Sequence, residues 1–272
     1  MRKWKMALAG VLSLFMVEAP AVCSMPVYSV AAAETTVQDT DVLKGLVKEN
    51  GKYYYYVDGK MQKGWQNVTT TKSNGQSVTY RYYFGANGAA YAATPKQKTL
   101  VKKISGKYYG FNSLGRARTN TFCNVKLKKG KKTFTYRYYF GANGAAYAGK
   151  KSYGTAEIAV KKIKGKYYGF YLNGNMVKGT WVKGGKFYVF GKNGVYNASL
   201  SKKLRAAAGY EKEASTLLSL IGNPKKVQVL ENTCYGDGTE MYYYYDNYFA
   251  DIFKFSGTGK TIVLGVSAKY FC

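Results

Sequence analysis

Residues 80–92 read YRYYFGANGAAYA, and residues 136–148 repeat the same thirteen letters. A self-similar block that recurs along a chain is the sequence signature of a repeat architecture. Each copy begins with alternating aromatic residues, which favour a β-strand, and continues into Asn-Gly, which favours a tight turn with positive φ. The block therefore predicts a β-hairpin unit that belongs to an array and not to a single globule.

Related stretches surround these two copies and raise the expected number of units to six. They are GKYYYYVDGKMQKGW from Gly51, GKYYGFNSLGRARTNTF from Gly106, GKYYGFYLNGNMVKGTW from Gly165 and GGKFYVFGKNGVYNAS from Gly184. Because one hairpin buries too little surface to be stable alone, we expect residues 51–199 to form an elongated solenoid of stacked hairpins. Residues 67–79 and 124–135 are expected to form extended hairpin arms, and the tip of the second arm, 129–131, presents positive charge.

The composition changes after Ser199, where a small C-terminal α+β domain (200–272) is expected in an otherwise mainly β chain. Residues 201–221 predict two helical pieces broken at Gly209 and ended by Gly222-Asn223-Pro224. Four strands are predicted after the helices, at 226–231, 240–245, 249–255 and 261–266. Helices followed by a run of strands indicate helices packed on one face of an antiparallel sheet.

The N-terminal residues predict export. A basic start, an apolar run and Ala31-Ala32-Ala33 make residues 1–33 a signal peptide, and residues 34–50 a linker. No later stretch is apolar enough to span a bilayer, so no transmembrane segment is expected in the mature chain.

The charge is concentrated in the repeats. The net charge is +28, and residues 51–199 hold 28 Lys and Arg against only Asp58 and Glu157. Such a field favours polyanionic partners. The alternative is that the lysines only keep a tyrosine-rich surface soluble.

The chain lacks the usual catalytic and metal-binding residues. It contains no histidine, and the two carboxylates of the repeats lie 99 positions apart, at 58 and 157, so we expect no enzyme activity, no metal and no cofactor. Outside the signal peptide, three cysteines remain. Cys234 and Cys272 are expected to form a disulfide within the terminal domain, which leaves Cys123 alone in the repeats.

The strings YYYYVDGKMQKGW (53–65) and YYGFYLNGNMVKGTW (167–181) resemble the cell-wall-binding repeats of Gram-positive bacteria, a group that includes choline-binding and glucan-binding modules. The resemblance covers about residues 51–199 and implies a secreted, wall-associated protein. In choline-binding members, tryptophans of successive hairpins hold the quaternary ammonium by cation–π attraction. Only Trp65 and Trp181 match here, and a cationic shell repels choline. The resemblance therefore implies wall glycan or teichoic-acid-like polymers as partners.

Two sets of residues are candidates for ligand contact. The first set is aromatic, and each member has a core role as its alternative: Tyr54, Trp65, Tyr83, Tyr108, Phe122, Tyr139, Tyr167 and Trp181. The second set is basic, and its alternative is a solvated loop: Lys126, Lys128, Lys129, Lys131 and Lys132.

Three functional hypotheses follow. The leading one is a non-catalytic surface protein whose repeats bind wall polymers and display the terminal domain. In the second, the repeats are a spacer and the terminal domain binds or inhibits another protein, because TLLSLIGNP (216–224) and the strands after it are similar to small domains of envelope assembly proteins and β-lactamase inhibitor proteins. The third, a nucleic-acid platform, is disfavoured by the export signal.

Overall fold

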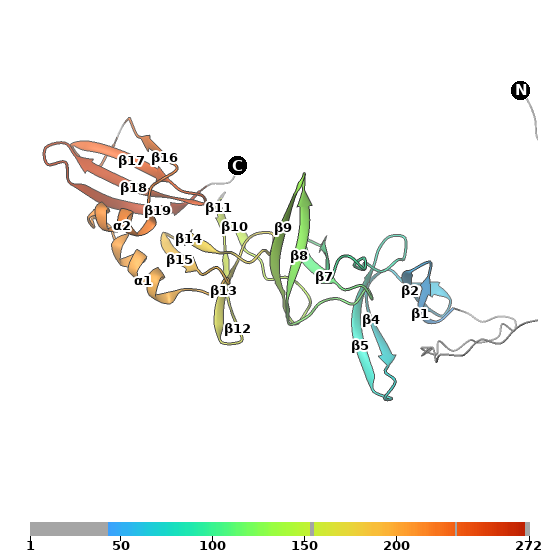
Figure 1. Cartoon of the computed structure of the whole chain (residues 1–272). Helices are drawn as coiled ribbons and strands as arrows, with labels where there is room; N and C mark the ends of the chain where they lie inside the picture. The colour runs from blue at the N-terminus through green and yellow to red at the C-terminus, as the bar shows by residue number, and fades with distance from the viewer. Residues whose placement is uncertain (1–42, 153–154, 232, 270–272) are drawn as a thin grey trace, which may run out of the picture. The chain divides into compact units, whose positions relative to one another are not determined.

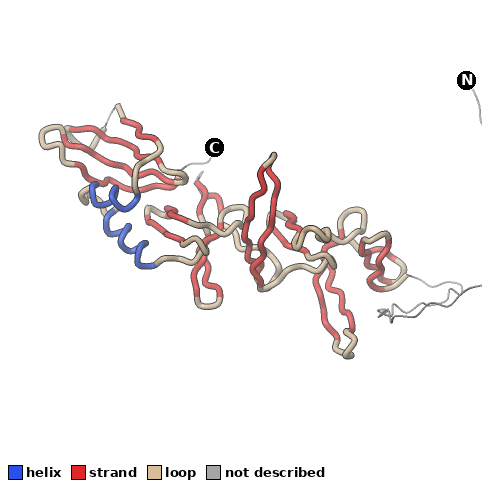
Figure 2. The backbone as a smooth tube through the Cα atoms, viewed as in Figure 1, coloured by secondary structure: helices blue, strands red, loops and turns tan. Residues whose placement is uncertain are grey.

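A computed structural model describes residues 43–152, 155–231 and 233–269. The described chain is mainly β, as predicted, and Figure 2 shows helix only between the last hairpin and the terminal sheet. The predicted signal peptide lies outside the described residues. Cys272 does too, so the expected Cys234–Cys272 disulfide is not tested; Cys234 itself is exposed.

Six antiparallel hairpins form the repeat region, as expected, and each pairs an aromatic strand with the strand before it. They are β1 (Gly45–Glu49) with β2 (Lys52–Val57), β4 (Gly64–Thr71) with β5 (Ser77–Phe84), β6 (Leu100–Ile104) with β7 (Lys107–Phe111), β8 (Thr121–Lys129) with β9 (Lys132–Phe140), β12 (Ala159–Ile163) with β13 (Lys166–Phe170), and β14 (Gly179–Lys183) with β15 (Lys186–Phe190). The two longer pairs, β4–β5 and β8–β9, are the predicted arms. Short strands β3 (Lys60–Met61) and β10 (Lys150–Ser152) with β11 (Thr155–Glu157) complete the region.

The pairing within each unit differs from the sequence prediction. We expected each hairpin to turn at its Asn-Gly or Asp-Gly, but the principal turn lies before the aromatic strand. Ser105 and Gly106 both have positive φ, 45° and 77°, which a type I′ hairpin turn requires. Residues 45–49, which we expected in the linker, form β1. The turn before the aromatic strand makes these residues the partner of β2, and Leu46 packs in the same cluster as Tyr55.

The segments after the Asn-Gly turns join successive hairpins. Ala90 makes a bridge with Phe84 of its own hairpin, and its N–H donates to the Tyr53 carbonyl of the previous hairpin at 2.8 Å. The same donation recurs from Ala117 to Arg81, Ala146 to Tyr108, Met176 to Arg137 and Tyr196 to Tyr167. The predicted stacking of hairpins is therefore carried by one repeated backbone contact.

A phenylalanine at the end of an aromatic strand is buried at nearly every junction. Phe84, Phe111, Phe140, Phe170 and Phe190 are each 2% exposed or less. Full burial of such a ring stabilises a fold by about 1.5–3 kcal/mol. The aromatic strands therefore supply a chain of small cores.

The terminal domain has the predicted α+β composition. Its elements are α1 (Ala198–Ala207), α2 (Ala214–Ile221), β16 (Lys226–Val229), β17 (Gly238–Tyr244), β18 (Tyr248–Phe255) and β19 (Thr261–Ala268). The four strands form one antiparallel sheet in chain order, and Figure 1 shows both helices on the same side of it. Neither described helix is long and apolar enough to cross a membrane.

The last hairpin shares its core with the terminal domain. Val182 and Phe187 of β14–β15 belong to the same buried cluster as Leu204 of α1, Leu217 of α2 and Ile252 of β18. Arg205 adds a hydrogen bond from its Nε to the Phe187 carbonyl at 2.7 Å. The hairpin and the domain are therefore continuous in packing across the predicted boundary at 199/200.

Candidate functional site

Four of the predicted aromatic residues meet in two equivalent clusters at hairpin junctions. The Trp65 ring centroid lies 5.2 Å from that of Tyr83 and 4.6 Å from that of Tyr109 in the next hairpin. Phe122 occupies the same place one repeat later, 4.8 Å from Tyr139 and 5.0 Å from Tyr168. Their rings bind successive hairpins together, and Tyr139 is only 8% exposed.

An arginine covers the aromatic face in each cluster. The Arg81 guanidinium carbon lies 4.0 Å from the Trp65 ring centroid, and that of Arg137 lies 4.4 Å from Phe122. A guanidinium over a ring makes a cation–π contact of the kind that a quaternary ammonium would make. The chain's own cations therefore already occupy these ring faces.

The other predicted aromatic residues are spread over separate strands. Tyr108 and Tyr167 lie on β7 and β13, each with a cross-strand lysine Nζ within 6 Å of its ring, and Tyr167 is 47% exposed. Tyr54 is half-buried on β2. The structure does not bring these three side chains into the clusters above.

The predicted lysines line the exposed part of the β8–β9 arm. Lys126, Lys128, Lys131 and Lys132 are exposed; Lys129 lies in β8, and its side chain is not among those described. Because strand residues alternate between faces, Lys126 and Lys128 share a face with Asn124. The arm therefore carries a row of positive charge toward its base.

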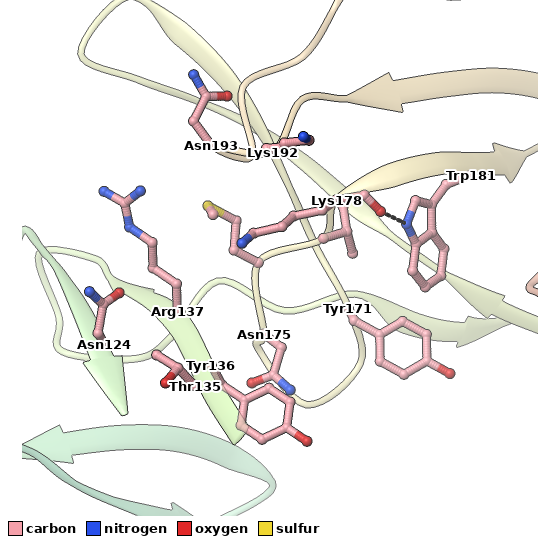
Figure 3. Close-up of a pocket in the computed structure, with 12 residues that line it drawn as sticks. Asn124, Thr135, Tyr136, Arg137, Tyr171, Asn175, Lys178, Trp181, Lys192 and Asn193 are labelled. Atoms are coloured by element: carbon pink, nitrogen blue, oxygen red, sulfur yellow. Dashed lines mark hydrogen bonds between the residues drawn. The ribbon is translucent and has the colours of Figure 1, made fainter. Parts of the chain in front are cut away.

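A cavity of about 570 Å³ lies at the base of this arm (Figure 3). Arg137 of β9, Lys178 before β14 and Lys192 after β15 line it, and none of its described lining residues is acidic. Figure 3 shows the Arg137 guanidinium and the Lys178 ammonium extending into the same open space, with Lys192 and Asn193 on another segment. Three cations from three separate segments thus share one hollow.

One wall of the cavity is aromatic and another offers amides. The rings of Tyr171 and Trp181 lie 5.3 Å apart, and the Trp181 indole N–H donates to the Lys178 carbonyl at 3.1 Å. Burial raises the pKa of Tyr171, so its phenol stays neutral at ordinary pH. Asn175 has a buried side-chain oxygen without a hydrogen-bond partner among the described residues. The site thus combines cations, ring faces and hydrogen-bonding amides.

A second cavity of about 370 Å³ adjoins the same strands. Asn124 and Thr135 line both cavities, and Lys96, Lys98 and Lys126 line the second. Positive side chains therefore continue on both sides of the β8–β9 arm.

Sequence reasoning found Trp181 and the arm lysines but missed Arg137, Lys178 and Lys192. These three residues lie in different units, and their approach depends on how the units stack. One signal was available: the turn Gly141-Ala142-Asn143-Gly144 becomes Gly191-Lys192-Asn193-Gly194 in the last unit, which adds a charge.

Comparisons with known proteins give only distant structural matches. No family model matches the chain, and no curated protein sequence matches it. Similar solved structures include choline binding protein F from Streptococcus pneumoniae, at 18% identity over 80% of this chain and 86% of that one, with a TM-score of 0.23. They also include the Cpl-1 endolysin in complex with a peptidoglycan analogue, at 18% identity and a TM-score of 0.26, and a truncated alternansucrase from Leuconostoc mesenteroides, at 18% and 0.27. The match to the endolysin covers 50% of this chain and 38% of the endolysin. The match to the alternansucrase covers 74% of this chain and 16% of the alternansucrase.

Proposed function

We propose that this chain is a secreted, non-catalytic protein of the Gram-positive cell surface that binds an acidic wall glycan or a teichoic-acid-like polymer through its repeats. One observation carries the proposal: the β8–β9 arm and the cavities at its base gather lysine and arginine side chains, and none of the described residues lining those cavities is acidic. The terminal domain is then displayed from the attached array.

The physical argument is electrostatic and multivalent. A polyanion that binds a row of lysines releases its condensed counterions, which favours binding at low salt. Several weak contacts along one polymer add in avidity without any single tight site. The arginine-covered rings of Trp65 and Phe122 argue against choline as the ligand, because a second cation would compete with the guanidinium.

The test uses the full chain without residues 1–33. Binding to poly(glycerol phosphate) and to an uncharged dextran of similar length is measured by isothermal calorimetry across a salt series. We expect the phosphate polymer to bind with an affinity that falls steeply with salt, and dextran to bind at least tenfold more weakly. Equal binding of both polymers, or an affinity that salt does not change, contradicts the proposal.

Matched charge variants separate the arm from the net charge. K126A/K128A removes two exposed charges from the arm, and K202A/K203A removes two exposed charges from α1. Both lower the net charge equally, so binding that depends only on net charge falls equally in both. We expect a larger loss in the arm variant.

A second candidate function rests on the terminal sheet. Tyr242, Tyr244 and Phe249 form an aromatic cluster, with Tyr242 and Phe249 4.6 Å apart, on the face opposite the one packed by Tyr243 and Tyr248. Aromatic surface of this kind is enriched at protein interfaces. Attachment to cell walls that survives the arm variant but is lost in F249S favours this module over the repeats.

A further inference from the structure

The two identical sequence blocks place Arg81 and Arg137 in equivalent positions. Each carbonyl accepts a backbone hydrogen bond at 2.7 Å from the following unit, Arg81 from Ala117 and Arg137 from Met176. Each guanidinium lies over an aromatic ring of its partner strand. The two arginines therefore provide a comparison within one molecule.

The two guanidiniums differ in what else they bind. The Arg81 Nη1 donates to the Asn143 carbonyl at 2.6 Å, in the turn two hairpins further on. The Arg137 guanidinium makes no hydrogen bond or ion pair with any residue of the described chain, although the equivalent turn residue, Asn193, lines the cavity with it. The first junction is closed by the chain itself, whereas the second leaves the guanidinium donors unused.

The residues around the open junction add positive charge. Lys192 stands in the turn where the first junction has Ala142, and Lys178, two residues after Met176, stands where the first junction has Thr119. Like charges that converge on one hollow repel each other, and an anion between them removes that repulsion. These two lysines favour an anionic ligand at the second junction. Arg116 and Arg118 of the first junction, which Asn175 and Val177 replace in the second, bind the Tyr82 hydroxyl and the Lys98 carbonyl of the chain itself.

We propose that the Arg137 cavity is a specific site for one oxyanion group, a phosphate or a carboxylate, carried by an acidic glycan. The guanidinium binds two of its oxygens side by side, because its planar fork matches that geometry. Lys178 and Lys192 neutralise the remaining charge, and the ring faces of Tyr171 and Trp181 contact the adjoining sugar. This inference rests on the proposed function and names the subsite within it.

The experiment compares R137Q with R81Q in the chain without residues 1–33. Each substitution removes one positive charge from the same local sequence and one guanidinium from the face of an aromatic ring. We expect R137Q to weaken binding of poly(glycerol phosphate) or polygalacturonate about tenfold or more, and R81Q to weaken it by less than about threefold. The preferred polymer distinguishes phosphate from carboxylate. Equal losses in both variants overturn the specific site.

A second pair of variants avoids any effect of an arginine on folding. K192A removes an exposed lysine of the cavity, and K107A removes an exposed lysine of β7 that lines none of the cavities described above. We expect a loss of about threefold or more for K192A and no measurable loss for K107A. Indistinguishable affinities of the two variants contradict the site.

An independent readout separates this site from the proposed function. The indole N–H signals of Trp181, in the cavity, and Trp65, outside it, are followed by NMR during titration with inorganic phosphate. We expect the Trp181 signal to shift, the Trp65 signal to stay, and the shift to disappear in R137Q. A shift without polymer binding retains the site and refutes the proposed function. Polymer binding without a shift, and with equal losses in R137Q and R81Q, refutes the site alone.

Discussion

Gly110 allows two hairpins to pack closely, and its replacement by alanine tests the junction energetics. A Cβ at Gly110 lies 2.5 Å from two ring carbons of Phe140 and 3.0 Å from the Thr99 methyl. Carbon atoms in van der Waals contact are about 3.5–4.0 Å apart. The ring of Phe140 is fully buried. The substitution therefore forces two hairpins apart by about 1 Å.

The expected cost follows from two opposing effects. Overpacking a core costs about 1–3 kcal/mol, while replacing glycine by alanine restricts the unfolded chain and returns about 0.4–1 kcal/mol. We expect G110A to lower the free energy of unfolding by about 1–2 kcal/mol. The control is G265A, another strand glycine, because a Cβ there meets nothing within 4 Å. G265A is expected to be neutral or slightly stabilising.

The measurement is urea unfolding of the chain without residues 1–33, which removes Trp4, followed by tryptophan fluorescence in a W181F background. Trp65 then reports this junction, since its ring stacks 6.0 Å from Phe111, the neighbour of Gly110. The double variant G110A/F140L relieves the clash, and its loss should be smaller than the sum of the two single losses. Unfolding of G110A at the same urea concentration as G265A, or strict additivity in the double variant, refutes the packing argument.

Three further predictions concern single side chains. Burial and the neighbouring Glu240 raise the pKa of Asp251 from 3.8 to about 6, so its native form binds more protons than its unfolded form between those values, and stability falls as pH rises from about 4 to 6. D251N should abolish that fall, as measured by urea unfolding. After allowance for solvent screening of this half-buried group, the free energy of unfolding at pH 7 should rise by about 1 kcal/mol. An unchanged pH profile contradicts this prediction. Cys123 is buried and should react with a thiol reagent only after unfolding, as mapped by mass spectrometry; labelling in native protein contradicts its burial. R205Q loses the hydrogen bond to the Phe187 carbonyl and should lower the urea midpoint by an amount equivalent to about 1–2 kcal/mol, whereas an unchanged midpoint shows that the bond contributes little.

Much of the fold could be predicted because its signals are local. The alternating aromatic residues mark each strand, and turn residues with positive φ mark its ends. The predicted helix break at Gly209 and the helix end at Gly222 also depend on nearby residues. In the structure, Gly209 lies between α1 and α2, and α2 ends just before Gly222. Such features need no knowledge of which units touch.

The pairing of strands was harder to predict because two turns compete in each unit. Asn-Gly is the stronger hairpin signal, but the strand after it is too short to pair along its length and forms one bridge, as Ala90 does with Phe84. Ser105-Gly106 is weaker by composition, yet it joins two five-residue strands, β6 and β7. The longer ladder decides the pairing, since each added residue adds hydrogen bonds and side-chain contacts.

The candidate site was hidden from sequence for a related reason: identical local sequence does not imply an identical environment. Residues 80–92 and 136–148 are the same, yet Arg81 is bound by the chain and Arg137 faces a cavity. The turn that lines the cavity with Arg137 holds Lys192, fifty-five residues further along the chain, where the turn bound by Arg81 holds Ala142. In a stacked array, each unit's ligand-binding capacity is set partly by units further along, because they supply the opposite wall. A repeat array can therefore place the same arginine in two environments, one in which the chain binds the guanidinium and one in which lysines of later units line a cavity beside it.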